Sequence, residues 1–195
     1  MSADGASEHR SIAPEVLVLL SGGIDSSACV DFYRSLGRAV CALHISYGQG
    51  AAVQERQAAA RVATHFGVPI SFRRLESARP KSIGEVRGRN GFLVLTAVVE
   101  RPPSVTAIAL GIHAGTQYLD CSSAFVGAIN ETLRLDGKGL ELLAPFLTWT
   151  KGDVLHYCAE RSVPIQLTYS CERGGDTPCG VCLSCTDRRA AHACP

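Results

Sequence analysis

The chain alternates short apolar runs with longer stretches in which apolar residues recur at helical spacing. Residues 16–20 form the first apolar run, and Gly37 ends the helical pattern that follows it. The alternation predicts strands at 16–20, 39–45, 68–72, 105–110 and 140–144, and helices at 25–36, 51–66, 89–99, 120–133 and 150–160. Strands separated by helices favour a parallel sheet, so we predict an α/β fold, doubly wound and mainly parallel, with five strands.

The pattern divides the chain into three expected parts. Residues 1–14 are small and polar, without the basic and apolar segments of a secretion signal, and predict a flexible tail. Residues 15–165 are expected to form the α/β domain, with a polar loop at 76–88. From residue 166 the apolar periodicity stops, and we call residues 166–195 the cysteine module because most of the cysteines gather there.

Composition and charge fit a soluble globular protein. The 195 residues are 46% hydrophobic and 19% charged, and the net charge is +1. This charge gives no electrostatic reason to expect nucleic acid or an anionic membrane as the main partner. The apolar runs fall far short of the roughly 18 residues that a membrane span requires. We therefore expect a cytoplasmic protein.

The cysteines indicate a metal site more than a disulfide framework. There are nine of them, an odd number, in a chain without a secretion signal. Cys171, Cys179, Cys182 and Cys185 are spaced so that their thiolates can close a tetrahedron around Zn²⁺. An iron–sulfur cluster bound by the same ligands and a set of free thiols are the alternatives. The cysteine module has too few apolar residues to fold on packing alone, which favours one structural zinc ion.

The segment between the first predicted strand and the first predicted helix, which we call the glycine loop, carries candidate chemistry. Its sequence is Ser21-Gly22-Gly23-Ile24-Asp25-Ser26-Ser27. The glycines allow a tight turn, and the serine hydroxyls add donors beside the free N–H groups of a helix start. Phosphate binding is the interpretation that uses all of these residues. The alternative is an ordinary capped helix, with Asp25 or Ser26 as the N-cap.

The glycine loop is not a Walker loop, because no lysine follows its second glycine. It resembles the SGGxDS signature of the PP-loop ATP pyrophosphatases, which cleave ATP between the α and β phosphates and leave AMP on a substrate oxygen. The resemblance implies that Mg²⁺ bridges the phosphates. It also implies an ATP-binding set of Ser21, Gly22, Gly23, Asp25, Ser26 and Ser27.

Other motifs follow along the chain before the cysteines. They are Tyr47-Gly48-Gln49, Gly88-Arg89-Asn90, Tyr118-Leu119-Asp120-Cys121 and Trp149-Thr150-Lys151. In order and approximate spacing, from Val16 to His192, the chain resembles the 7-cyano-7-deazaguanine synthases. Those PP-loop, zinc-containing enzymes convert 7-carboxy-7-deazaguanine to the nitrile precursor of queuosine.

The resemblance implies an AMP-forming C–N ligase that adenylates a carboxylate. Lys151, Arg89 and Asp25 are then the catalytic candidates, with the two cations neutralising phosphate charge. Surface ion pairs are the alternative for these cations. The substrate-binding candidates are Tyr47, Gln49, Asn90, Tyr118 and Asp120. Among these, the carboxylate can accept hydrogen bonds from a guanine-like edge, and a tyrosine can stack on the base.

Differences from the family concentrate at the expected rim of the site. In the family, an Arg-His pair follows Tyr-Gly-Gln, whereas this chain has Gly50 and Ala51. The family also has an arginine after the YxDC element, whereas this chain has Ser122. The segment before Gly88 is also shorter, which indicates a reduced lid. Smaller side chains and fewer charges predict a crevice that is more open and less cationic near the acyl group.

The amine that receives the activated acyl group stays open between two possibilities. Ammonia gives an amide and, after a second adenylation, the nitrile. An amine of a partner protein or other large acceptor would suit an open rim. A non-catalytic nucleotide sensor is a third hypothesis, against which the intact glycine loop with Lys151 argues. A tRNA-modifying enzyme is expected to have a basic surface and paired catalytic cysteines, which this sequence does not show. A homodimer is a possible assembly.

Overall fold

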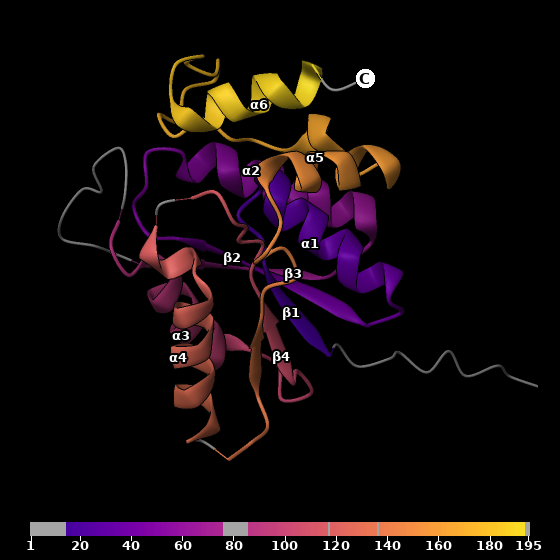
Figure 1. Ribbon diagram of the computed structural model, residues 1–195. Helices are drawn as coiled ribbons and strands as arrows, with labels where there is room; N and C mark the ends of the chain where they lie inside the picture. Colours follow the sequence, from indigo (N-terminus) through magenta and orange to yellow (C-terminus); the bar gives the residue numbers. More distant parts are fainter. Residues whose placement is uncertain (1–14, 76–85, 117, 136, 194–195) are drawn as a thin grey trace, which may run out of the picture.

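One parallel sheet forms the centre of the structure (Figure 1). The computed structural model describes residues 15–75, 86–116, 118–135 and 137–193. The strands are β1 Val16–Leu19, β2 Val40–Ser46, β3 Ile70–Arg74, β4 Ala107–Ala109 and β5 Glu141–Leu143. All pairs are parallel, in the order β3-β2-β1-β4-β5. The predicted α/β fold with a five-stranded parallel sheet is confirmed.

Helices cover both faces of this sheet (Figure 1). They are α1 Ile24–Ser35, α2 Ala52–Phe66, α3 Arg89–Glu100, α4 Ser123–Arg134, α5 Lys151–Glu160 and α6 Leu183–Ala193, with 3₁₀ turns η1 Leu119–Cys121 and η2 Ile165–Leu167. The sequence analysis missed α6. Its residues carry few apolar side chains, so no periodic pattern marked it.

Helix α4 begins later than its pattern predicted. The hydroxyl oxygen of Ser122 accepts a hydrogen bond from the Phe125 backbone N–H at 3.2 Å and caps the helix. Asp120, predicted as the first helical residue, lies instead in the turn η1. The serine that replaces the family's arginine therefore serves as a helix cap.

Two apolar layers, one on each face of the sheet, make up the core. Successive side chains of a strand point to opposite faces, so β1 contributes to both layers. Val16 and Val18 pack with residues of α1, α2 and α5, whereas Leu17 and Leu19 pack with residues of α3 and α4. Each fully buried side chain of this kind contributes about 1.5–3 kcal/mol. The sheet therefore holds the starts of α1 and α5 on a rigid support.

The position of β1 predicts a ligand site at the carboxyl ends of the strands. β1 lies between β2 and β4, so the chain connections reverse direction beside it. A Cβ atom on Gly111, in the loop after β4, would lie 2.5 Å from the carbonyl oxygen of Asp25. The loop after β4 thus passes directly against the start of α1.

Parts of the expected organisation lie outside the described residues. These are the tail at 1–14, residues 76–85 of the expected loop, and Cys194. Among the described helices, none has both the length and the apolar character needed to cross a membrane.

Candidate active site

The glycine loop leaves the start of α1 open. Gly23 is the N-cap, and no side chain caps the helix, so the alternative that Asp25 or Ser26 is an ordinary N-cap is wrong. The hydroxyl oxygen of Ser21 accepts from the Gly23 N–H at 3.2 Å. The N–H groups of the first helical turn are therefore available to an anion, which is also favoured there by the helix dipole.

The serine hydroxyls of the glycine loop differ in their surroundings. The hydroxyls of Ser26 and Ser27 both donate to the Gly23 carbonyl oxygen, at 3.1 and 2.8 Å. Ser26 also lies 3.0 Å from the Ser21 hydroxyl oxygen. Ser27 is fully buried. Ser21 and Ser26 thus form a pair at the open side of the loop, while Ser27 lies beneath it.

Gly22 makes the closest backbone approach in the glycine loop. Its φ is +90°, and a Cβ atom there would lie 2.5 Å from the Glu55 carbonyl oxygen and 2.9 Å from the Ala59 nitrogen in α2. Tyr169 N–H donates to the Gly22 carbonyl oxygen at 2.9 Å. The loop is therefore held between α2 and the cysteine module.

We expect Gly22→Ala to lower the free energy of unfolding by about 2–4 kcal/mol, because it combines a positive φ with a steric clash. Chemical denaturation of the purified protein measures this change. Gly37→Ala is the matched control, because Gly37 has a φ of +73° and nothing within 4 Å of its Cβ position. Equal losses in the two variants would contradict the close packing at Gly22.

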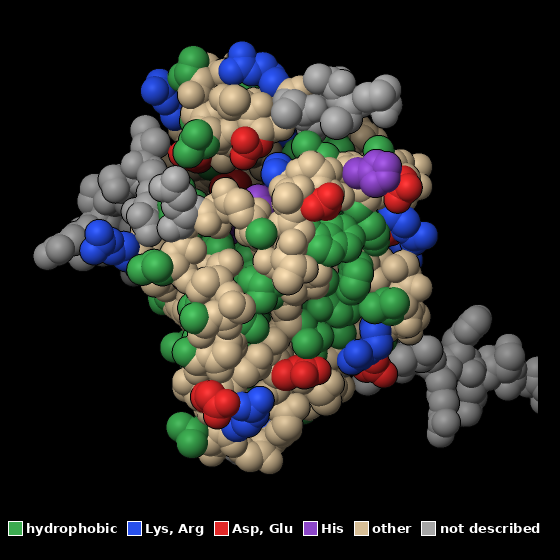
Figure 2. Space-filling model, in the orientation of Figure 1, with side chains coloured by type: hydrophobic (Ala, Val, Ile, Leu, Met, Phe, Trp, Pro, Cys, Tyr) green, Lys and Arg blue, Asp and Glu red, His purple; other side chains and the backbone are tan. Residues whose placement is uncertain are grey.

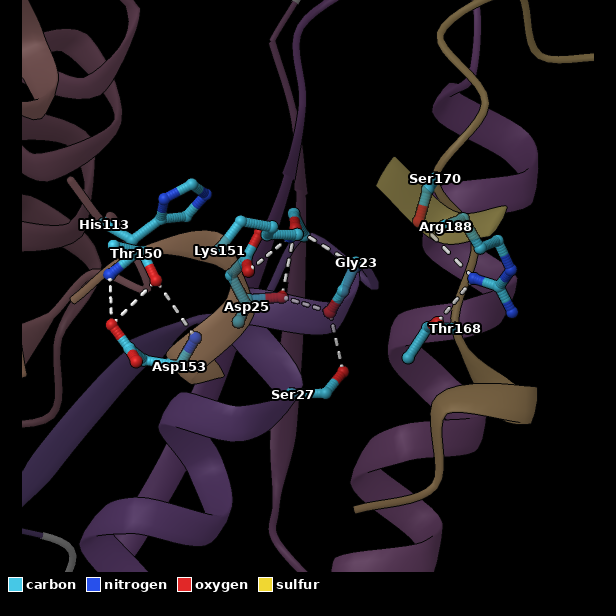
Figure 3. A network of polar contacts seen from close by, with 12 residues as sticks. Gly23, Asp25, Ser27, His113, Thr150, Lys151, Asp153, Thr168, Ser170 and Arg188 are labelled. Atoms are coloured by element: carbon cyan, nitrogen blue, oxygen red, sulfur yellow. Dashed lines mark hydrogen bonds and ion pairs between the residues drawn. The ribbon is translucent and has the colours of Figure 1, made fainter. Parts of the chain in front are cut away.

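Lys151 and Asp25 form an ion pair at the glycine loop (Figure 3). The Lys151 Nζ atom lies 2.6 Å from Asp25 Oδ1, and both side chains are about a quarter exposed, 24% and 27%. Lys151 opens α5, whose start is fixed by a capping box between Thr150 and Asp153. Hydrogen bonds from the Thr150 backbone N–H and hydroxyl lower the pKa of Asp153. The cation is thus carried by a rigid helix terminus.

A second polar group lies after β2, around Tyr47 and Arg89. The two side chains are hydrogen-bonded, and the Tyr47 phenol raises the pKa of the Arg89 guanidinium although burial acts in the opposite direction. Gln49 uses both ends of its amide. Nε2 donates to Glu55 Oε2 at 2.8 Å, and Oε1 accepts from the Tyr47 N–H at 2.8 Å. Gln49 therefore holds the loop after β2 onto α2.

Glu55 was missed by the sequence analysis. Burial raises the pKa of its carboxyl group, and Arg89 is close enough to lower it partly. The one sequence feature that could have indicated Glu55 is its position in the first turn of a helix that follows a glycine-containing loop.

Asn90 and Asp120 connect α3 to η1. The Asp120 carboxylate accepts from the Asn90 N–H at 2.9 Å, and the Asn90 side-chain NH₂ donates to the Asp120 carbonyl oxygen at 2.8 Å. Asn90 is only 4% exposed. Tyr118 is half-buried immediately before η1. The Asn90 amide group is thus engaged within the protein, whereas Asp120 keeps a second carboxylate oxygen.

The predicted site residues therefore fall into two groups. Asp25 and Lys151 meet at the glycine loop, and Tyr47, Arg89 and Asp120 are neighbours after β2 and before α4. Figure 2 shows a hollow beneath the layer that contains α6, in which acidic, basic and histidine side chains are exposed. No hydrogen bond joins the two groups in the described part of the chain.

The predicted metal ligands converge. The sulfur atoms of Cys171, Cys179, Cys182 and Cys185 all lie within 4.8 Å of one another. A zinc ion with bonds of about 2.3 Å needs sulfur separations near 3.8 Å, and Cys179 and Cys185 are 4.0 Å apart. The Val181 and Cys182 backbone N–H groups donate to Cys179 and lower its pKa. Such N–H···S bonds support metal-bound thiolates, so the residues fit a tetrahedral metal ion.

Arg188 anchors α6 to the rest of the protein (Figure 3). Its guanidinium donates to the Thr168 hydroxyl at 2.8 Å, to the Ser170 hydroxyl at 3.4 Å and to the Ile165 carbonyl oxygen at 2.9 Å. Arg189 donates to the Gly180 carbonyl oxygen at 2.7 Å. The sequence analysis gave neither arginine a role. Their contacts explain why α6 forms without an apolar face.

The rim at Gly50 lies against the backbone of the cysteine module. A Cβ atom on Gly50 would lie 3.4 Å from the Glu172 carbonyl oxygen, which is an ordinary contact, whereas one on Gly174 would clash with the Gly50 carbonyl group. Gly50 itself is exposed, and Ala51 is 2% exposed. The more open crevice stays a prediction, with the cysteine module packed beside it.

The parallel sheet and the uncapped glycine loop at its switch point define the class of this protein, a PP-loop nucleotide-binding protein. NMN synthetase from Francisella tularensis shares the fold, with a TM-score of 0.51 and 17% identity over 84% of this chain and 68% of that chain. The family described as queuosine biosynthesis protein QueC matches residues 15–86 and 80–194, and the chain belongs to this family. The two matched ranges overlap at residues 80–86, within the segment that looked shortened in the sequence.

Two curated relatives carry the name 7-cyano-7-deazaguanine synthase. The protein from Prochlorococcus marinus is 32% identical over 211 residues, which cover 92% of this chain and 93% of that protein. The protein from Methanosphaerula palustris is 29% identical over 209 residues, 92% of this chain and 94% of that one. The resemblance inferred from the motifs is confirmed.

Proposed function

We propose that this protein uses ATP to activate the carboxylate of 7-carboxy-7-deazaguanine and then joins the acyl group to an amine. It would be a cytoplasmic, AMP-forming C–N ligase. The main support is the pairing of an uncapped glycine loop with the Lys151–Asp25 ion pair, in a chain whose relatives are 7-cyano-7-deazaguanine synthases. An anion-binding helix start beside a cation is suited to a reaction that releases pyrophosphate.

Activation changes a poor electrophile into a good one. A carboxylate oxygen of the substrate attacks the α-phosphorus of ATP, an O–P bond forms, and pyrophosphate leaves with the electrons of the broken bond. The N–H groups at the start of α1 would hold the phosphates, and Lys151, beside Asp25, would neutralise charge on the leaving group. If Mg²⁺ binds, Asp25 would be the residue that holds it, and the ion would neutralise phosphate charge.

The second polar group is our candidate for the deazapurine pocket. Asp120 has a free carboxylate oxygen for the guanine-like edge, and Tyr47 or Tyr118 is available for stacking. Arg89, held by Tyr47, would complement the substrate carboxylate or the α-phosphate. Gln49 and Asn90, whose amides are engaged internally, would position this pocket and not contact the base through those groups. A zinc ion on the cysteines would be structural.

Ammonia is the acceptor that we favour. The relatives named 7-cyano-7-deazaguanine synthase support this choice, because a nitrile carries one new nitrogen and no larger group. Ammonia would give the amide, and a second adenylation followed by loss of AMP would give the nitrile. A protein amine remains the alternative acceptor, and a non-catalytic sensor is the remote alternative.

Mass spectrometry of the products tests this proposal. The protein is incubated with ATP, Mg²⁺ and 7-carboxy-7-deazaguanine, with and without ammonia. We expect AMP and pyrophosphate to appear only with the deazaguanine acid, and a product mass of the amide or the nitrile only with ammonia. Deazaguanine attached to an added protein would favour the alternative acceptor. Nucleotide binding without any AMP would refute both enzymatic proposals.

A further inference from the structure

His113 lies in the loop after β4, at the crevice edge of the sheet. Gly111, two residues earlier, passes against the carbonyl oxygen of Asp25. Figure 3 shows His113, which is half-buried, in one view with Thr150 and Lys151. The sequence analysis gave this residue no role. The loop that passes against the start of α1 therefore carries a titratable group two residues beyond Gly111.

A hydrogen bond determines which ring nitrogen of His113 is basic. Nδ1 lies 2.5 Å from the carbonyl oxygen of Ala114. A carbonyl oxygen only accepts, so Nδ1 carries the proton and donates it, which leaves the lone pair on Nε2. Within the described residues, Nε2 has no hydrogen-bond partner. The neutral ring therefore presents a free proton acceptor.

Three other titratable groups near the strand ends are engaged, and Asp120 is the candidate for the guanine-like edge. His44 is 1% exposed, and its two nitrogens lie 3.0 Å from the Leu20 carbonyl oxygen and 3.3 Å from the Ser46 hydroxyl oxygen. Lys151 is paired with Asp25 at 2.6 Å, and the Glu55 carboxylate accepts from Gln49 at 2.8 Å. His113 is thus better placed than these groups to accept a proton from a reactant.

We propose that His113 is the catalytic base for the amine that attacks the activated acyl group. This inference rests on the proposed function. The amine nitrogen bonds to the acyl carbon, the bond from that carbon to the AMP oxygen breaks, and AMP leaves with the bonding electrons. Nε2 of His113 takes one proton from the amine nitrogen and becomes imidazolium. A base is needed because the nitrogen bears a positive charge once the new bond forms.

His113→Asn separates this step from activation, because its amide can still donate to the Ala114 carbonyl oxygen but offers no basic nitrogen. Activation alone is measured as pyrophosphate exchange into ATP, with 7-carboxy-7-deazaguanine and no amine. Amine capture is measured as amide formation at saturating ammonia, across pH. We expect exchange within about twofold of the unaltered protein, and amide formation slower by at least about 100-fold.

His65→Asn is the matched control, since His65 is an exposed residue of α2, and it should change neither rate. Added imidazole should partly restore amide formation in His113→Ala. Equal losses of exchange and amide formation in His113→Asn would show a structural role and overturn the inference. Unchanged amide formation would overturn it as well. If the unaltered protein shows no exchange, the proposed function itself fails, a result distinct from either of these.

Discussion

Lys151→Met is expected to lower the rate of substrate-dependent AMP formation by about 1,000-fold, because it removes the cation beside the glycine loop. Lys151 lies 2.6 Å from Asp25 on a capped helix terminus, so its charge is already in place before ATP binds. The methionine keeps the aliphatic stem but leaves Asp25 unpaired where phosphate charge develops. The loss of this positive charge removes its attraction for the departing pyrophosphate.

The rate is measured as AMP released from ATP in the presence of 7-carboxy-7-deazaguanine. Lys138→Met is the control, because Lys138 lies in an exposed segment between α4 and β5. Unfolding of both variants is followed in parallel, so that a loss of fold is distinguished from a loss of charge. A rate within threefold of the unaltered protein for Lys151→Met would contradict the role proposed for this residue.

Loss of the metal is expected to lower the stability of the cysteine module strongly, since the free energy of metal binding at such a site contributes directly to folding. Cys182→Ser should bind less than one equivalent of zinc and should lose several kcal/mol of stability in the cysteine module. The affinity for ATP should fall as well. The Tyr169 N–H donates to the Gly22 carbonyl oxygen, so disorder in this module removes a contact that holds the glycine loop.

Three measurements follow this variant: metal content, hydrogen exchange of residues 165–189, and ATP affinity. We expect faster exchange in that segment and an affinity reduced at least about tenfold. Thr177→Ser, an exposed change in the same loop, is the control. Full ATP affinity in a protein that has lost its zinc would show that the module does not support the glycine loop.

The fold could be predicted because each strand and most helices carry their own periodic pattern. Helix α6 could not, because its stability comes from Arg188, which reaches Thr168 and Ile165. Those contacts join residues that are 20 and 23 positions apart, and no local pattern records them.

The sequence indicated which residues are candidates for the site, but it did not indicate how their side chains are arranged. Lys151 and Asp25 are 126 positions apart, so only the folded sheet reveals their ion pair. Gln49 and Asn90 were assigned to substrate from motifs, and this stays a prediction; the motifs did not reveal that the Gln49 amide and the Asn90 side-chain NH₂ also form hydrogen bonds within the protein. His113 and Glu55 were missed because a single titratable residue in a loop or a helix carries no recognisable spacing.

The contact between Gly50 and the backbone of residues 172–174 makes two distant segments interdependent. Any side chain at position 174 would require the cysteine module to move away, because its Cβ atom would clash with the Gly50 carbonyl group. The placement of the module beside the rim therefore depends on glycine at position 174. A chimera that brought a larger residue to this position would force a side chain into the space that the Gly50 backbone occupies.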